Sequence, residues 1–201
     1  MRWRHICVLI AGLLSLLLTG TASATTTGID IDTLRTTQTG PMTFASGLTR
    51  QTCTATFTKS YNERLVEVSP ELTKIGKIGS GILANCPILD TRLLNLATVL
   101  GGLPAPGPLP TSWDIAFISS DLANGNMNIA ILDFQVRIAS GFTCLYRGVL
   151  GGYVTADGTR LHLSSILPLE PGSSPGCPAT LTVTAILTNA PAVDFTLLPE
   201  D

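Results

Sequence analysis

Two equally spaced pairs of cysteines constrain this chain more than any other feature of its sequence. Cys53 and Cys86 lie 33 residues apart, and Cys144 and Cys177 repeat that separation. Neither a C-x-x-C spacing nor companion histidines accompany them, which argues against zinc ligation. Four cysteines allow three connectivities, and we favour Cys53–Cys86 with Cys144–Cys177 because these bonds close the shorter loops. In the chain-entropy model, each bond would stabilise the fold by roughly 3–4 kcal/mol.

Residues 1–24 have the pattern of an export signal. A basic start precedes an apolar run at 6–18, and the small residues T-G-T-A-S-A follow it. The run is too short to span a bilayer, so the pattern predicts a signal peptide that is cleaved after Ala24 and carries Cys7 away. We therefore expect a secreted chain that begins at Thr25, with no membrane span after processing. Its remaining cysteines would pair in an oxidising compartment.

Charge and composition narrow the classes of partner and fold. The chain has 12 basic and 14 acidic residues among 201, and no basic cluster occurs in it. Nucleic acid and anionic lipid surfaces are therefore not expected as partners. Nineteen glycines and 13 prolines favour strands and turns over helices. We find no motif for a cofactor or a metal.

Alternation of apolar residues and threonines predicts half-buried strands. Cys53, Ala55 and Phe57 alternate with threonines, and 181–187 repeats the pattern. We expect an all-β fold, namely an antiparallel β-sandwich with Ig-like or Greek-key-like connections, held by the two disulfides. In this interpretation 25–40 is a flexible lead-in or a first edge strand, and 41–201 form a single domain.

The sequence predicts the cross-strand residue pairs of two hairpins. In the first, Asn124-Gly125 forms the tip. The predicted pairs, all on one face, are Phe117 with Leu132, Ile115 with Phe134, and Trp113 with Val136. This register places Trp113 in the core.

The second hairpin turns at Asp157-Gly158. It pairs Val154 with Leu161 on the inward face, and Tyr153 with His162 on the outward face. Just before it, Gly151-Gly152 predicts a bulge or bend.

Two further segments affect the topology. The run at 90–100 has both a helical start at Asp90 and strand-like alternation of leucines, and we favour a strand. The proline-rich stretch at 103–112 predicts a stiff connection, because alternate prolines remove backbone donors.

One small outward patch is the candidate binding site. Tyr153 and His162 are cross-strand neighbours, flanked by Thr155 and Arg160. Such an amphipathic patch can stack on a sugar or a peptide, and the alternative is an ordinary stabilising cross-strand pair. Outward threonines also form an array, for which we expect no role beyond an exposed strand face. They are Thr54, Thr56, Thr58, Thr182 and Thr184.

Catalytic chemistry finds little support. His162 is the only histidine after the signal segment, and no G-x-S-x-G motif accompanies it. Glu63 and Glu67 would lie roughly 13 Å apart on one strand face, too far for the usual hydrolytic pair. Asp114 and Asp133 are expected on the outward face of the first hairpin as solubilising charges.

Short motifs occur in a characteristic order along the chain. They are T-F-A-S at 43–46, T-C-T at 52–54, a Gly-rich run at 76–86, L-P-T-S-W at 109–113 and C-L at 144–145. This order resembles a group of exported actinobacterial proteins of uncharacterised function, although two residues here separate Pro110 from Trp113 where those proteins have a tighter L-P-W form. The resemblance implies export and a β-sandwich, and it implies no site residues.

Together these features predict a non-catalytic extracellular or cell-envelope binding module. Its partner would be an extracellular polysaccharide or protein. Two alternatives from other classes stay open: a small secreted hydrolase acting through His162, and a carrier that shelters an apolar ligand between the sheets.

Overall fold

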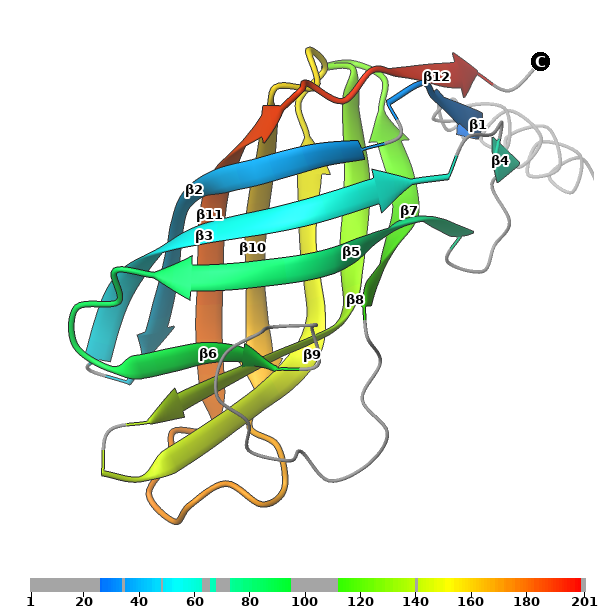
Figure 1. Ribbon diagram of the computed structural model, residues 1–201. Coiled ribbons are helices and arrows are strands. Elements are labelled where there is room, and N and C mark those ends of the chain that lie inside the picture. Colours follow the sequence, from blue (N-terminus) through cyan, green and yellow to red (C-terminus); the bar gives the residue numbers. More distant parts are fainter. Residues whose placement is uncertain are drawn as a thin grey trace, which may run out of the picture.

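Every regular element described by the computed structural model is a β-strand (Figure 1). The structure describes residues 26–33, 35–47, 49–62, 66–67, 73–94, 112–139 and 141–199. Within these ranges, no helix has the length and apolar character needed to cross a membrane. The strands are β1 (Thr26–Ile31), β2 (Arg35–Ser46), β3 (Thr49–Tyr61), β4 (Val66–Glu67), β5 (Thr73–Ala84), β6 (Asp90–Leu94), β7 (Trp113–Asp121), β8 (Asn126–Ala139), β9 (Thr143–Val154), β10 (Arg160–Pro168), β11 (Thr180–Ala190) and β12 (Phe195–Pro199).

The main sheet closes on itself. Its strand order is β6-β8-β7-β5-β3-β2-β11-β10-β9, and β9 also pairs with β8 along most of its length. This last pairing closes an eight-stranded antiparallel barrel from β8, β7, β5, β3, β2, β11, β10 and β9. Strand β6 lies outside the ring and pairs with the second half of β8.

The predicted sandwich is therefore wrong, while the all-β class and both disulfides are confirmed. Alternation gives each strand one inward and one outward face, and a sandwich and a barrel require the same pattern. Closure depends instead on curvature. Register shifts interrupt the ladders of β5, β7 and β8, and such bulges bend and twist strands.

A separate three-stranded sheet, β12-β1-β4, lies at the upper right end of the barrel in Figure 1. Ile29 and Ile31 of β1 are buried and belong to the same apolar cluster as the barrel interior. The lead-in predicted at 25–40 thus contributes β1 and the first half of β2. Neither strand is an edge strand, because β1 lies between β12 and β4, and β2 lies between β3 and β11.

Apolar side chains fill the barrel interior. Trp113 has no exposed surface, and its ring centroid lies 4.6 Å from that of Phe134 and 6.1 Å from that of Phe57. These rings come from β7, β8 and β3, so they join three strands at the centre of the core. The predicted core position of Trp113 is confirmed.

The register predicted for the first hairpin is wrong. Asp121 pairs with Asn126 across a four-residue loop, and Ile115 pairs with Ile131 instead of Phe134. The ladder also shifts between Phe117 and Ser119, which adds one bulged residue to β7. Five of the six residues predicted inward are buried, but Leu132 is only half-buried because the bulge between Ile131 and Phe134 changes the phase of the alternation in β8.

The second hairpin is confirmed. Val154 pairs with Leu161 inside, and Tyr153 pairs with His162 outside. The bulge predicted at Gly151-Gly152 lies instead in β8, where the register shifts between Ile131 and Phe134 and Asp133 has φ 60°.

Both disulfides have the predicted pairing and lie toward the end of the barrel opposite β1. Cys53–Cys86 joins β3 to the segment after β5, and Cys144–Cys177 joins β9 to the loop between β10 and β11. The strand predicted at 90–100 is confirmed for Asp90–Leu94. The rest of that run, most of the proline-rich connection, the signal segment and Glu63 lie outside the described residues.

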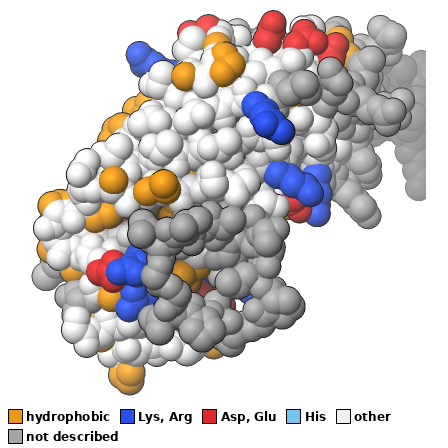
Figure 2. Space-filling model, viewed as in Figure 1, with side chains coloured by type: hydrophobic (Ala, Val, Ile, Leu, Met, Phe, Trp, Pro, Cys, Tyr) orange, Lys and Arg blue, Asp and Glu red, His pale blue; other side chains and the backbone are white. Residues whose placement is uncertain are grey.

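Charged side chains are scattered over the visible face of the described residues. Figure 2 shows Lys, Arg, Asp and Glu in small separate groups among mostly neutral atoms. The charges predicted for the first hairpin have partners: Asp114 lies 2.5 Å from the Lys74 amine, and Asp133 binds Arg147. Exposed pairs of this kind contribute at most about 1 kcal/mol each.

Candidate functional site

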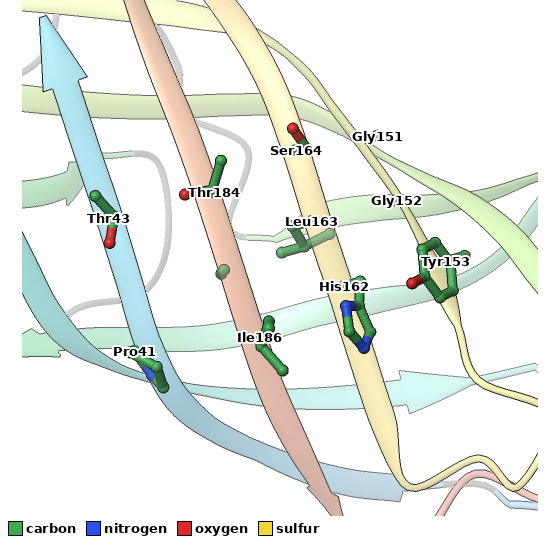
Figure 3. A pocket seen from close by; sticks show the side chains of 11 residues that line it. Pro41, Thr43, Gly151, Gly152, Tyr153, His162, Leu163, Ser164, Thr184 and Ile186 are labelled. Carbon is green, nitrogen blue, oxygen red and sulfur yellow. The ribbon is translucent and has the colours of Figure 1, made fainter.

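A groove on the outer wall of the barrel contains the Tyr153–His162 pair (Figure 3). Its volume is about 470 Å³, and β2, β9, β10 and β11 form it. The lining residues are Pro41, Thr43, Gly151, Gly152, Tyr153, His162, Leu163, Ser164, Thr184, Ala185 and Ile186. None of them is Lys, Arg, Asp or Glu. The groove therefore suits a neutral ligand.

The Tyr153 and His162 rings are stacked face to face. Their centroids lie 4.7 Å apart and their planes differ by 4°. Each ring thus covers one face of the other, and both side chains are partly exposed to solvent. Within the described residues, the His162 ring makes no hydrogen bond or ion pair, so nothing there orients it as a general base. The hydrolase alternative is not tested by this geometry and stays a prediction.

The other two predicted site residues lie outside the groove lining. Thr155 belongs to the turn: its hydroxyl donates to Asp157 Oδ1 at 2.6 Å and accepts from Arg160 N at 3.1 Å. The Thr155 hydrogen bond, with those from Thr159, lowers the pKa of Asp157 to about 2. Arg160 is exposed at the start of β10 and pairs with Thr188. Thr155 therefore shapes the hairpin that presents Tyr153.

A row of hydroxyl groups crosses the sheet along one side of the groove. Ser164 pairs with Thr184, Thr184 with Thr43, and Thr43 with Thr52. The Thr43 and Thr52 hydroxyl oxygens lie 2.8 Å apart. Neighbouring strands are about 4.8 Å apart, so the row extends for roughly 14 Å. It offers regularly spaced hydroxyls to an extended ligand.

The floor of the groove depends on Gly152. A Cβ at this position would lie 1.9 Å from the His162 carbonyl oxygen and 2.9 Å from Leu163 Cδ2. We expect Gly152→Ala to lower the free energy of unfolding by about 1–3 kcal/mol, because β9 and β10 must separate to admit the methyl group. Chemical denaturation followed by circular dichroism measures this loss.

Gly151 provides the matched control. Its added Cβ would meet only Ser165 Oγ, at 3.7 Å, which is an ordinary contact. Gly151→Ala should therefore change the free energy of unfolding by less than about 0.5 kcal/mol. Equal losses in the two variants would contradict the close approach of β9 and β10 at Gly152.

Sequence reasoning missed the β2 and β11 side of the groove. Pro41, Thr43 and Ile186 reach it through the pairings of β11 with β10 and with β2. The only available signal was the outward position of alternate residues in 181–187, which placed Thr184 on the exposed face without naming its neighbours. Among the described residues, no group of three or more His, Cys, Asp or Glu side chains could hold a metal ion.

No protein-family model, curated protein or solved structure matches this chain. The resemblance to exported actinobacterial proteins thus stays an expectation. Inferences about function depend on the geometry of the chain itself.

Proposed function

We propose that the protein is a non-catalytic extracellular or cell-envelope binding module, and that the outer groove binds a neutral polysaccharide. The observation that carries this proposal is the stacked Tyr153–His162 pair at one side of an uncharged groove of about 470 Å³. Sugar rings combine apolar C–H faces with hydroxyl groups. They match a surface that offers both ring carbon and side-chain hydroxyls.

The hydroxyl row supports an extended ligand over a single sugar. Thr184, Thr43 and Thr52 continue from the groove across β11, β2 and β3. Their methyl and hydroxyl groups are stiff at χ1, so binding them costs little side-chain entropy. A chain of sugars lying across these strands would contact the row and the aromatic pair together.

Export is part of the same proposal. The two disulfides support an oxidising compartment, since such bonds seldom persist in a reducing cytosol. We expect the exported protein to begin at Thr25, and N-terminal sequencing of the secreted product tests this. A secreted product that still contains residues 1–24 would contradict the proposed cleavage site.

Removal of the tyrosine ring tests the binding site. We expect Tyr153→Ala to weaken retention on an insoluble neutral polysaccharide about tenfold, because one stacking surface is lost. The half-buried ring lies outside the barrel, so the free energy of unfolding should fall by no more than about 1 kcal/mol. Depletion assays on cellulose, chitin and β-1,3-glucan measure retention, and denaturation measures stability.

Arg160→Ala is the control, since Arg160 is close in sequence and exposed but does not line the groove. It should retain wild-type binding. If the wild type is not retained on any of the three polymers, the proposed function fails. Equal losses in Tyr153→Ala and Arg160→Ala would move the site away from the groove.

A further inference from the structure

A second hollow lies at the disulfide end of the barrel, away from the Tyr153 groove. Its volume is about 290 Å³. Figure 1 shows that the β2–β3 and β8–β9 hairpins and the β10–β11 loop gather at this end, opposite β1, β4 and β12. The lining residues are Phe44, Ser46, Gly47, Thr49, Gln51, Leu89, Ile138, Phe142, Cys144, Tyr146, Gly176, Pro178 and Leu181. We call this hollow the mouth pocket.

The lining of the mouth pocket is apolar and uncharged. Three aromatic rings, from Phe44, Phe142 and Tyr146, face the space together with Leu89 and other aliphatic side chains. Phe142 is 46% exposed, so its ring lies where the pocket opens to solvent. No lining residue is Lys, Arg, Asp or Glu, so an ionised group placed here would lose its hydration without gaining a counter-charge.

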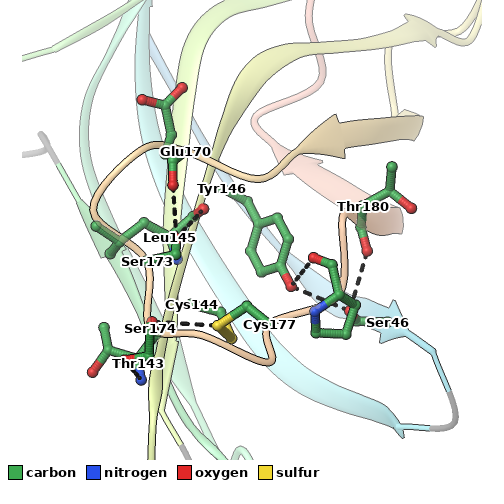
Figure 4. Close-up of a disulfide and its surroundings, with 11 residues drawn as sticks. Ser46, Thr143, Cys144, Leu145, Tyr146, Glu170, Ser173, Ser174, Cys177 and Thr180 are labelled. Atoms are coloured by element: carbon green, nitrogen blue, oxygen red, sulfur yellow. Dashed lines mark hydrogen bonds between the residues drawn. A yellow bond between two sulfur atoms is a disulfide. The ribbon is translucent and has the colours of Figure 1, made fainter.

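Two hydroxyl oxygens in the mouth pocket are acceptors. Tyr146 Oη donates its proton to the Pro178 carbonyl at 3.1 Å, and Ser46 Oγ donates its own to the Thr180 carbonyl at 3.1 Å (Figure 4). The two oxygens lie 3.3 Å apart. A hydroxyl group has one proton, so both oxygens keep only lone pairs for a further partner. They fit a ligand that donates a hydrogen bond.

The walls of the mouth pocket are cross-linked in place. Cys144–Cys177 attaches the β10–β11 loop to β9, and Ser174 Oγ in that loop accepts from Thr143 N at 3.0 Å. Cys53–Cys86 anchors the segment that leads to Leu89, whose backbone N–H donates to Gln51 Oε1 at 2.9 Å. A site whose walls are already ordered binds without a large entropic cost.

We propose that the mouth pocket binds a small neutral molecule with an apolar body and one hydroxyl group. The body packs against the rings of Phe44 and Phe142, and the hydroxyl donates to Ser46 Oγ or Tyr146 Oη. The volume is slightly below the 300–1,000 Å³ usual for ligand pockets, so the occupant is closer in size to a medium-chain alcohol or a phenol than to a whole lipid. This site is independent of the polysaccharide groove.

Competition with a neutral fluorescent probe tests the ligand chemistry. N-phenyl-1-naphthylamine should bind the wild type saturably, with enhanced emission, and 1-octanol should displace it. Octanoate, which adds a charge, and 1-methoxyoctane, which lacks a donor, should each compete at least about tenfold more weakly. Octanoate that competes as well as octanol would overturn the neutral ligand, and an equally effective ether would overturn the acceptor role of Ser46 and Tyr146.

A charge introduced at the opening of the mouth pocket tests where the probe binds. Phe142→Asp should weaken probe binding at least about tenfold, because it places a carboxylate beside an uncharged pocket. Ile166→Asp is the matched control: Ile166 is 67% exposed on the outward face of β10 and does not line the mouth pocket. Equal effects of the two variants, or no saturable probe binding by the wild type, would overturn the proposal. Polysaccharide retention should be unchanged in Phe142→Asp, so the two proposals fail separately.

Discussion

Replacement of Trp113 by alanine should lower the free energy of unfolding by about 3–5 kcal/mol. The side chain has no exposed surface and packs against Phe57 and Phe134 at the centre of the barrel. Its removal leaves a cavity between three strands whose backbones are fixed by hydrogen bonds on both sides, so the site can collapse only partly. Guanidinium unfolding of the chain that starts at Thr25 measures the loss.

Ile118→Ala is the control on the same strand, because Ile118 is 46% exposed. It should cost less than about 1 kcal/mol. Trp113→Phe keeps part of the ring packing and gives a measurable value even if the alanine variant does not fold. In the chain from Thr25, Trp113 is the only tryptophan, so its emission should be blue-shifted and poorly quenched by iodide. Red, freely quenched emission would contradict its position in the core.

The sequence predicts inward and outward faces well because alternation is a local property. Phe57, Val154 and Leu161 are buried as expected, and the Asp157-Gly158 turn fixes the register of β9 and β10. The first hairpin failed for two physical reasons: its loop has four residues, 122–125, instead of two, and the bulge between Phe117 and Ser119 adds a residue to β7 that no turn motif signals. Bulges also produce the curvature that closes the barrel, so sandwich and barrel could not be distinguished from alternation.

Half of the candidate site could be predicted for the same reason. Tyr153 and His162 belong to one hairpin, and their contact follows from the turn. The partners of the hydroxyl row, Thr43 and Thr184, lie on strands far apart in the sequence. Their contact depends on strand order, which single-sequence patterns do not encode. The mouth pocket was unpredictable on the same ground, since four separate segments contribute to it.

One interior residue departs from the apolar pattern. Continuing the alternation of Cys53, Ala55 and Phe57 places Lys59 inside the barrel, and the structure finds it 1% exposed. Its amine donates to Tyr61 Oη at 3.1 Å, and no acidic side chain in the described residues forms a salt bridge with it. Burial lowers the pKa of Lys59 well below its usual value and raises that of Tyr61.

This burial predicts stability that rises with pH. The pH window runs from the lowered pKa of Lys59 in the folded chain up to the usual lysine pKa of 10.5. Between these two values the unfolded chain binds a proton that the folded chain excludes. Within that window the free energy of unfolding should increase by up to about 1.4 kcal/mol per pH unit. Above about pH 10 the trend should reverse, because Tyr61 ionises in the unfolded chain and stays neutral when folded. Urea denaturation at intervals from pH 7 to pH 11 measures both the rise and the fall in the free energy of unfolding.

Lys59→Met should remove the rise of the free energy of unfolding with pH, since methionine has a similar length and no proton to exchange. The double variant Lys59→Met/Tyr61→Phe should remove both the rise and the fall of stability with pH. It also removes the Tyr61 hydroxyl, which would otherwise lose the hydrogen bond from Lys59, so we expect this variant to be more stable than wild type at pH 7. Lys77→Met, at an exposed position of β5, is the control and should keep the wild-type slope. A wild-type slope that persists in Lys59→Met would show that another group carries it. Wild-type stability that stays flat from pH 7 to pH 10 would show that the barrel accommodates the charged amine.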